Sequence, residues 1–595
     1  MFSQDEVLDS LPPHLRPFAA RQDYSLYTPR DQAVWRFLLH QLREHLASTA
    51  QATYLEGLQR TGITLDAIPR IEEMNRCLND IGWRAVVVDG FIPPAIFMEF
   101  QAQKVLVIAV DIRSFEHMLY TPAPDIVHES AGHAPFIIDV DYAEFLQRFG
   151  ELGMHAIASK SDMSVYEAIR CLSIVKEAPN ATAEEIAAAE QSLQTAIEAN
   201  DTPSEAALLA RLHWWTVEYG LVGSVDDYRL YGAGLLSSLG ECVNCLDDER
   251  VIKRPLTLDA INTSYDITNE QPHLFVTRNC RHLTQVLEEF GRQMCVNRGG
   301  AESVQKAIDA ETVNTAVTNA GVEISGQFTR LLTDAMGNIT YICTTGPTQL
   351  AYRGKQLPGQ GVEAHSAGFG SPVGRLQAME RCLGSYTIDE LKQHGITEAS
   401  HVSLAFLSGV TVSGQLTKIL RREQKNLIFT FEQCTVTSGD GECLFQPEWG
   451  LFDMAVGADI DSVYGGAADP QTYSLYAAPT LQATVHVDYD EATQTLFDYY
   501  AHLRQLREGA EASPATARQS LLDLIRDLEA SGTDEWLIYF ELLELGKTVA
   551  LDESVCRRLE VRLQQLADTD DTDRSTLIGY GLERLPTSDS TAAVS

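Results

Sequence analysis

Hydrophobic residues recur at helical spacing through the first half of the chain and predict a mainly helical region. A helix is expected to begin at Thr28, because threonine caps helices and the proline that follows suits a first turn. The apolar residues Val34, Phe37 and Leu38 continue this run at helical spacing. We therefore expect residues 15–320 to form one mainly α domain.

Three segments interrupt or extend this helical pattern. Residues 83–88 and 104–110 are short apolar runs rich in valine, which predict strands. Residues 155–212 are rich in alanine and glutamate, with apolar positions at helical spacing. This last segment predicts a helical insertion with an acidic outer face.

The pattern changes near residue 325, where apolar and polar residues begin to alternate. Alternation in residues 404–420 and again in 427–436, with a polar connection between them, predicts a β-hairpin. We expect residues 326–480 to form a β-rich domain of unknown role.

The C-terminal segment returns to helical spacing. Leu521, Leu524, Ile525 and Leu528 share one face of a predicted helix, and residues 485–570 are expected to be a helical region. Residues 571–595 are rich in Thr, Asp and Ser and predict a disordered tail.

Composition narrows the classes of partner. The net charge of −38 argues against nucleic acid or an anionic membrane surface. No stretch approaches the apolar length of a membrane span, and the first residues lack the basic start and apolar core of a secretory signal. Eleven scattered cysteines favour reduced thiols, so we expect a cytoplasmic protein.

The most informative motif contains two histidines five residues apart, His128 and His133. Residues at that spacing point away from each other on an α-helix. Gly132 is a common helix terminator and Pro135 cannot continue a helix. We therefore predict that a helix ends between the histidines, so that the loop carrying His133 turns back and both imidazoles can bind one metal ion.

A third ligand is needed, and Glu218 is the candidate. It is the only carboxylate in a strongly apolar, aromatic helical stretch, residues 212–220, where a charge must be paired or bound to a cation. A structural salt bridge remains an equal alternative on residue types alone. Two imidazoles and one carboxylate form the facial triad of non-haem iron oxygenases, but zinc with the same ligands would make a hydrolase.

Three long blocks of sequence carry a resemblance. They are residues 120–133, with Asp125-Ile126-Val127-His128-Glu129 and Gly132-His133; residues 214–221, with Thr216-Val217-Glu218-Tyr219-Gly220; and residues 231–241, with Gly232-Ala233-Gly234 and Ser237-Ser238. In this order they closely resemble the aromatic amino acid hydroxylases, over about residues 20–300. The resemblance implies a mainly helical catalytic domain that uses Fe(II), molecular oxygen and a tetrahydropterin.

Roles carried over from this family are assigned residue by residue. The implied iron ligands are His128, His133 and Glu218. The implied residues of the amino acid pocket are Arg113, which binds the carboxylate, Asp125, which holds that arginine, and Thr121, Trp214, Gly234 and Ser237. The implied residues of the pterin pocket are Phe97, Glu129, Gly90 and Ile92.

The implied reaction is ring hydroxylation of a free aromatic amino acid, with phenylalanine converted to tyrosine. Tryptophan or tyrosine is the alternative substrate within the family, and a zinc-dependent hydrolase is the alternative from another class. The expected partners are the amino acid, oxygen and the pterin, with neither nucleic acid nor a membrane. A homo-oligomer assembled through the C-terminal region is a further hypothesis.

Two positions depart from the family. His213 stands where the hydroxylases typically carry a tyrosine beside the pterin pocket, and Val107 stands where the animal enzymes that act on phenylalanine have a histidine. These changes bear on substrate preference rather than on the type of reaction.

Overall fold

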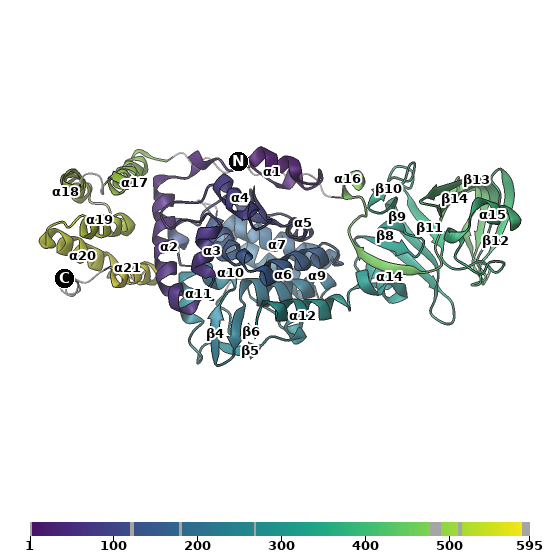
Figure 1. Ribbon diagram of the computed structural model, residues 1–595, viewed down its shortest axis with the longest axis horizontal. Helices are drawn as coiled ribbons and strands as arrows, with labels where there is room; N and C mark the ends of the chain where they lie inside the picture. The colour runs from purple at the N-terminus through teal and green to yellow at the C-terminus, as the bar shows by residue number, and fades with distance from the viewer. Residues whose placement is uncertain are drawn as a thin grey trace.

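The computed structural model describes residues 3–119, 124–177, 181–200, 202–266, 269–475, 489–509, 514–569 and 571–585. The molecule is elongated, with three parts in a row along its longest axis (Figure 1). A helical body lies in the middle, a β-rich part lies at one end, and the C-terminal helices lie at the other. The chain thus runs from the body to the β-rich part and returns past the body to the opposite end.

Helix α2 (Pro29–Thr49) lies between the helical body and the C-terminal helices. Its start is as predicted: the Thr28 hydroxyl accepts from the N–H of Asp31, and the Asp31 carboxylate accepts from the N–H of Thr28. Residues on all sides of α2 are buried, because body elements cover one face and α17, α19 and α21 cover the other.

The other helices of the body are α1 (Gln4–Ser10), α3 (Tyr54–Arg60), α4 (Ile71–Asn79), α5 (Pro94–Ala102), α6 (Val140–Gly153), α7 (Lys160–Glu177), α8 (Ala183–Glu198), α9 (Glu205–His213), α10 (Ala233–Ser237), α11 (Leu239–Asn244), α12 (Cys280–Gly291), α13 (Cys295–Arg298) and α14 (Gly300–Asp309). In the described residues, each helix is too short or too polar to span a membrane.

The predicted valine-rich strands are confirmed. β1 (Arg84–Val88) and β2 (Val105–Ala109) pair in parallel, in a register that sets Arg84 opposite Val105. A second small sheet was missed; it contains β3 (Leu221–Ser224), β4 (Asp227–Leu230), β5 (Ile252–Pro255) and β6 (His273–Thr277) in the order β4-β3-β6-β5. These strands are only four or five residues long, and β4 and β5 carry charged side chains, so their pattern is weak.

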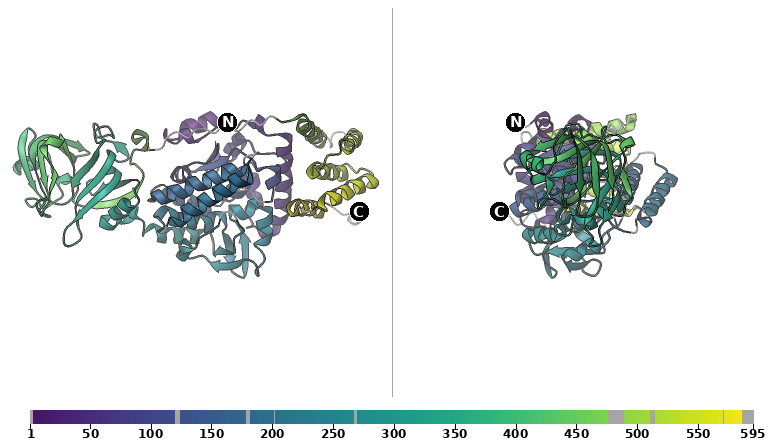
Figure 2. Two further views of the ribbon diagram at one scale, coloured as in Figure 1. Left: turned by 180° about the vertical axis from the view of Figure 1, so that it is seen from behind. Right: turned by 90° about the vertical axis from the view of Figure 1, so that its right-hand side faces the viewer.

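The helical insertion is shorter than predicted. Only α7 and α8 form a separate hairpin, which packs around its own small apolar cluster and lies on the outer face of the body (Figure 2). Helix α9 belongs to the main core instead, since Leu209 and Leu212 are buried there. It leads directly into the segment that carries Glu218.

The β-rich part contains two antiparallel sheets and begins earlier than predicted. Its first strand starts at Val313 rather than at residue 326, because small polar side chains between 313 and 325 mask the alternation. One sheet has the order β10-β9-β8-β7-β17 with β11 beside β9, and the other has the order β12-β13-β14-β15 with β16 beside β14.

The strands and helices of this part have the following bounds: β7 (Val313–Thr318), β8 (Val322–Thr333), β9 (Ile339–Tyr352), β10 (Lys355–Gln356), β11 (Gly368–Pro372), α15 (Ile388–Gln393), β12 (Ser400–Ala405), β13 (Thr411–Arg422), β14 (Lys425–Thr437), β15 (Cys443–Phe445), β16 (Phe452–Ala455), β17 (Ile460–Gly465) and α16 (Pro470–Tyr473). The predicted hairpin is β13–β14, but its turn is only Glu423-Gln424, with both residues at positive φ.

The C-terminal helices are α17 (Glu491–Gly509), α18 (Pro514–Ser531), α19 (Trp536–Thr548), α20 (Glu553–Ala567) and α21 (Thr572–Arg584). The prediction of a disordered tail from residue 571 is wrong for α21. Leu577 and Ile578 bury their side chains in the core, and Arg584 pairs with Glu544 of α19. Residues 586–595 lie outside the described residues.

The contact between α2 and α19 is both apolar and ionic. The Phe37 ring lies 5.1 Å from each of the Trp536 and Phe540 rings, measured between centroids. Beside them the Arg36 guanidinium pairs with Glu541 at 2.9 Å and with Glu544. One continuous core therefore includes the helical body and the C-terminal helices.

We expect Phe540→Ala to lower the free energy of unfolding by about 3–5 kcal/mol, since it removes a buried ring from this core. Val561→Ala on the exposed side of α20 is the control and should change it by less than about 0.5 kcal/mol. Denaturant unfolding followed by circular dichroism measures both. Equal stability of the two variants would contradict a shared core.

Candidate metal centre

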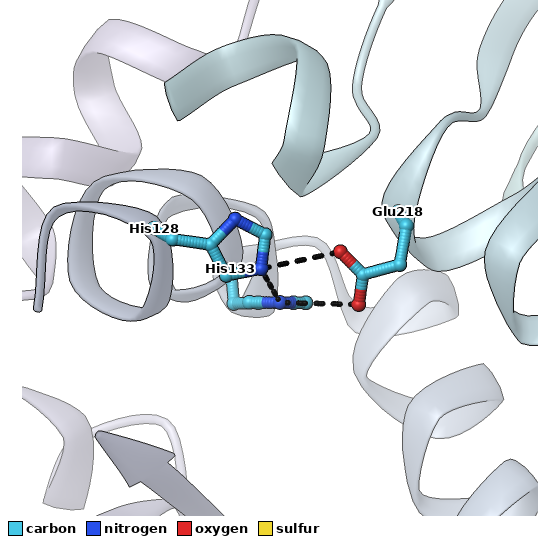
Figure 3. A group of neighbouring side chains, drawn as sticks. All are labelled: His128, His133 and Glu218. Atoms are coloured by element: carbon cyan, nitrogen blue, oxygen red, sulfur yellow. Dashed lines mark hydrogen bonds and ion pairs between the residues drawn. The ribbon is translucent and has the colours of Figure 1, made fainter. Parts of the chain in front are cut away.

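Two short π-helical turns carry the three candidate ligands. η4 (Val127–His133) holds His128 and His133, and η6 (Trp214–Glu218) ends at Glu218. Hydrogen bonds in a π-helix join residues five apart, so side chains at that spacing lie on one side. The spacing that would separate two histidines on an α-helix therefore brings them together here, facing the carboxylate of Glu218 (Figure 3).

The predicted end of a helix between the histidines is wrong. The chain stays helical through His133 and continues into the 3₁₀-helix η5 (Ala134–Ile138), where Pro135 lies in the first turn. A Cβ on Gly132 would lie 2.7 Å from the carbonyl oxygen of Ala233. Gly132 thus lets η4 pack directly against the backbone of α10 instead of ending a helix.

The three candidate ligand groups form a small triangle, in which Glu218 presents both carboxylate oxygens. Nε2 of His128 lies 3.2 Å from Oε2 of Glu218, Nε2 of His133 lies 3.4 Å from Oε1, and the two Nε2 atoms are 3.0 Å apart. Two donors about 2.1 Å from one ion lie about 3.0 Å apart at a right angle and about 3.4 Å apart at the tetrahedral angle. The spacing therefore fits a single metal ion of either geometry.

Ser237 fixes the orientation of the His128 ring. The Ser237 hydroxyl donates to the carbonyl of Ala233 at 2.8 Å, so its oxygen accepts from Nδ1 of His128 at 3.0 Å. Burial lowers the pKa of His128, but Glu218 more than offsets this and raises it to about 9, so a cation at the triangle must displace the proton on Nε2. Nδ1 keeps its proton and directs the Nε2 lone pair toward that cation. A metal-bound imidazole needs this arrangement.

The electrostatics of the triangle favour a cation. Burial alone would raise the pKa of Glu218, but His133 and His128 more than offset this and hold the pKa below its usual value. Burial also lowers the pKa of His133 to about 3, so this ring is neutral near pH 7 and its lone pair is free. A charged carboxylate and a neutral imidazole in a buried site are ligands that a metal ion prefers.

Two other titratable side chains lie beside the triangle. Glu129 has Oε2 3.9 Å from Nε2 of His133, and burial raises its pKa to about 8, so its carboxyl is mostly protonated at pH 7. His213 has Nδ1 3.6 Å from Oε1 of Glu218, and among the described residues its buried Nε2 has no hydrogen-bond partner. An unpartnered buried nitrogen indicates that a polar ligand atom could be accepted here.

Arg113 and Asp125 form a buried bidentate pair next to the triangle. Nε and Nη2 of Arg113 donate to the two carboxylate oxygens of Asp125 at 2.9 and 2.8 Å, and Nη1 donates to the carbonyl of Ser237 at 2.9 Å. Asp125 also accepts from the backbone N–H of His128 at 3.0 Å. These bonds use one hydrogen on each Nη, so each Nη keeps a second N–H that they do not use.

The remaining residues assigned to the amino acid pocket have different surroundings. Trp214 stacks on Tyr265, with centroids 4.4 Å apart and planes 13° apart. A Cβ on Gly234 would lie 2.9 Å from the Tyr219 ring, so this glycine serves close packing around η6. Thr121 lies outside the described residues.

The residues assigned to the pterin pocket gather around one apolar cluster. Phe97 on α5 and Ile92 in the preceding loop both pack against it, and Gly90 turns this loop with φ at 74°. The Phe97 ring lies 6.1 Å from the His213 ring, nearly perpendicular to it. His213, which lies beside Glu218, therefore connects Phe97 to the triangle.

Sequence reasoning missed two connecting roles. Asp125 caps the first turn of η4 in addition to holding Arg113, and the signal was its place three residues before His128. Ser237 contacts His128 and Arg113 together, and no local signal connects residues more than one hundred positions apart.

Comparison with known proteins identifies the family. The family model "Biopterin-dependent aromatic amino acid hydroxylase" matches residues 23–173 and 171–334, which together are more than half of the chain. The chain belongs to this family. The two matched segments of the family model meet at residues 171–173, which lie in α7 of the peripheral hairpin.

Relatives of this hydroxylase include the phenylalanine-4-hydroxylase of Pseudomonas aeruginosa, 30% identical over 264 residues that are 44% of this chain and 84% of the relative. The phenylalanine-4-hydroxylase of Chromobacterium violaceum is 28% identical over 268 residues, 45% of this chain and 75% of the relative. A crystal structure of the latter enzyme with iron(III) and 7,8-dihydrobiopterin aligns with 25% identity, covering 49% of this chain and 92% of that chain. The TM-score of this alignment is 0.38.

We expect Ser237→Ala to weaken Fe(II) binding by about 10–100-fold, because Nδ1 of His128 loses its acceptor. Ser238→Ala is the matched control, since the Ser238 hydroxyl donates to Leu119 and not to His128. Anaerobic titration with Fe(II) measures both affinities. The same affinity in both variants would contradict the role of Ser237.

Proposed function

We propose that this chain hydroxylates the ring of free L-phenylalanine to give L-tyrosine, using Fe(II), molecular oxygen and a tetrahydropterin. The observation that carries the proposal is the buried triangle of His128, His133 and Glu218 beside the Arg113–Asp125 pair. The family is biopterin-dependent, and the two relatives above are named as phenylalanine-4-hydroxylases. Tryptophan or tyrosine is the alternative substrate.

In this proposal His128, His133 and Glu218 would hold the iron. Bound Fe(II) would activate O2 and the reduced pterin would supply two electrons, so that one oxygen atom enters the ring and the other is reduced. The protein contributes fixed ligands: Ser237 orients His128, and the glycines at 132 and 232 let α10 pack against η4 and the backbone of Glu218.

Arg113 binds the carboxylate of the amino acid. A guanidinium matches a carboxylate with two parallel N–H bonds, and the Asp125 contacts hold it in one orientation before the substrate arrives. The carbonyl of Ser237 accepts from Arg113, and its hydroxyl accepts from His128. One residue therefore helps to position both the substrate carboxylate and the metal in this proposal. Trp214, Gly234 and Thr121 complete the proposed pocket.

The pterin is proposed to lie against Phe97, edged by the loop from Gly90 to Ile92 and close to Glu129. Support comes from the apolar cluster under Phe97 and from the unpartnered Nε2 of His213 beside it. A protonated Glu129 offers a hydrogen-bond donor to a ring nitrogen or carbonyl.

For the rest of the chain we propose that catalysis belongs to the helical body, followed in order by the β-rich part and the C-terminal helices. All eleven cysteines are free thiols, which supports a cytoplasmic protein. Assembly of a homo-oligomer through the C-terminal region stays a prediction.

Hydroxylation can be tested directly. Fe(II)-loaded protein with a tetrahydropterin and oxygen should convert phenylalanine to tyrosine, and Glu218→Ala should lower kcat by at least about 100-fold through loss of a metal ligand. Arg113→Lys should raise KM for phenylalanine about tenfold or more, since an ammonium cannot form the paired bonds. Chromatographic detection of tyrosine is the measurement.

Two results would contradict this proposal. One is no ring hydroxylation of phenylalanine, tryptophan or tyrosine by the iron-loaded protein. The other is hydrolytic activity that needs zinc and neither oxygen nor pterin, which would favour the hydrolase alternative.

A further inference from the structure

The loop that follows Arg113 contacts the C-terminal helices. Phe115 begins η3 (Phe115–His117), two residues after the arginine, and its half-buried ring lies 5.7 Å from the Trp536 ring between centroids. Trp536 is the first residue of α19, and its side chain is 3% exposed. A residue from the far end of the sequence therefore packs beside the proposed carboxylate-binding loop.

Arg30 makes a second connection at the same place. Its guanidinium carbon lies 5.5 Å from the Phe115 centroid and 5.7 Å from the Phe497 centroid, within the range of cation–π attraction. Its Nη1 lies 3.9 Å from Oε1 of Glu535, and the Tyr500 hydroxyl donates to that oxygen at 3.0 Å. Phe115 is thus held between a charged side chain of α2 and the C-terminal helices.

These contacts are not supplied by the part of the chain that matches the family. The family match ends at residue 334, whereas Phe497, Tyr500, Glu535 and Trp536 all come later. Two rings of α19, Trp536 and Phe540, pack on Phe37 of α2 at the same centroid distance of 5.1 Å. Of these two rings, only that of Trp536 contacts the Phe115 ring within the part of the chain that the structure describes.

We propose that the C-terminal helices position the substrate-binding loop in cis, with Trp536 as the positioning residue that acts on Arg113 through Phe115. This inference rests on the proposed function, since it assigns Arg113 to the amino acid carboxylate. Asp125 fixes the guanidinium of Arg113 on one side. The contacts of Phe115 with Trp536 and Arg30, together called the Phe115 clamp, fix the backbone that follows Arg113. Without the clamp, part of the binding free energy must order this loop.

The effect should be specific for ligands that carry the carboxylate. Phe115→Ala removes the ring from the clamp and leaves the Trp536–Phe37 core contact intact. We expect its dissociation constant for L-phenylalanine to rise about tenfold. The inhibition constant of 2-phenylethylamine, which has the same ring but no carboxylate, should stay within about twofold of the wild-type value.

Trp536→Leu and Phe540→Leu are matched variants of two buried α19 rings. Both lose a contact with Phe37 and should lower the melting temperature to a similar extent, but only Trp536→Leu should weaken binding of L-phenylalanine. Trp536→Phe should restore most of the affinity. In the double variant Phe115→Ala/Trp536→Leu the two losses should not add, since they break the same contact.

Full-length, iron-loaded protein and equilibrium dialysis of labelled L-phenylalanine suit this experiment. Wild-type affinity in Phe115→Ala, or equal loss in Trp536→Leu and Phe540→Leu, would overturn the inference while the proposed function stands. Equal weakening of phenylalanine and 2-phenylethylamine would also overturn it, because the carboxylate would not be involved. Failure of the wild type to bind any aromatic amino acid would instead overturn the proposed function, and the inference with it.

Discussion

Close contact between α10 and the two π-helical turns determines where the three ligand atoms lie. A Cβ on Gly132 would meet the carbonyl of Ala233, and a Cβ on Gly232 would meet the carbonyl of Glu218 at 2.4 Å. Backbone segments therefore touch at both points, with no flexible side chain between them. This rigidity holds the buried Glu218 carboxylate 3.2–3.4 Å from the two imidazoles, which offset the cost of burying its charge.

The same packing connects the candidate metal centre to the buried Arg113–Asp125 pair. Asp125 holds the Arg113 guanidinium and accepts from the backbone N–H of His128 in the first turn of η4, and Ser237 accepts from both Arg113 and His128. Such shared partners make the two subsites one rigid unit. The C-terminal helices add a further support from outside, through the ring of Phe115 and the core around Phe37.

Much of the candidate site could be predicted because its residue types are unusual in their surroundings. Paired histidines and a carboxylate among aromatic residues indicate a metal site, with a salt bridge as the alternative, and a long ordered set of motifs identifies the family. The local geometry could not be predicted, because the spacing of His128 and His133 has opposite meanings in α- and π-helices. Glycine and proline near His133 indicated a helix end, whereas Gly132 serves tertiary packing that no local pattern records.

In the fold, strong local signals succeeded and weak ones failed for identifiable reasons. The Thr28 cap and the valine-rich strands of β1 and β2 are encoded within a few residues. Helix α21 was missed because its sequence is polar on average, although Leu577, Ile578, Gly581 and the Arg584–Glu544 pair join it to the core. Helix α2 likewise shows no single apolar face, because both of its faces are covered by segments far apart in sequence.

Anomalous scattering from crystals of the iron-loaded protein tests the central claim most directly. Data above and below the iron absorption edge should show one iron peak, about 2.2 Å from Nε2 of His128, Nε2 of His133 and a carboxylate oxygen of Glu218. Glu218→Ala crystals should lose most of that peak. An iron peak elsewhere, or none at full iron loading, would contradict the assignment of these three residues as the metal centre.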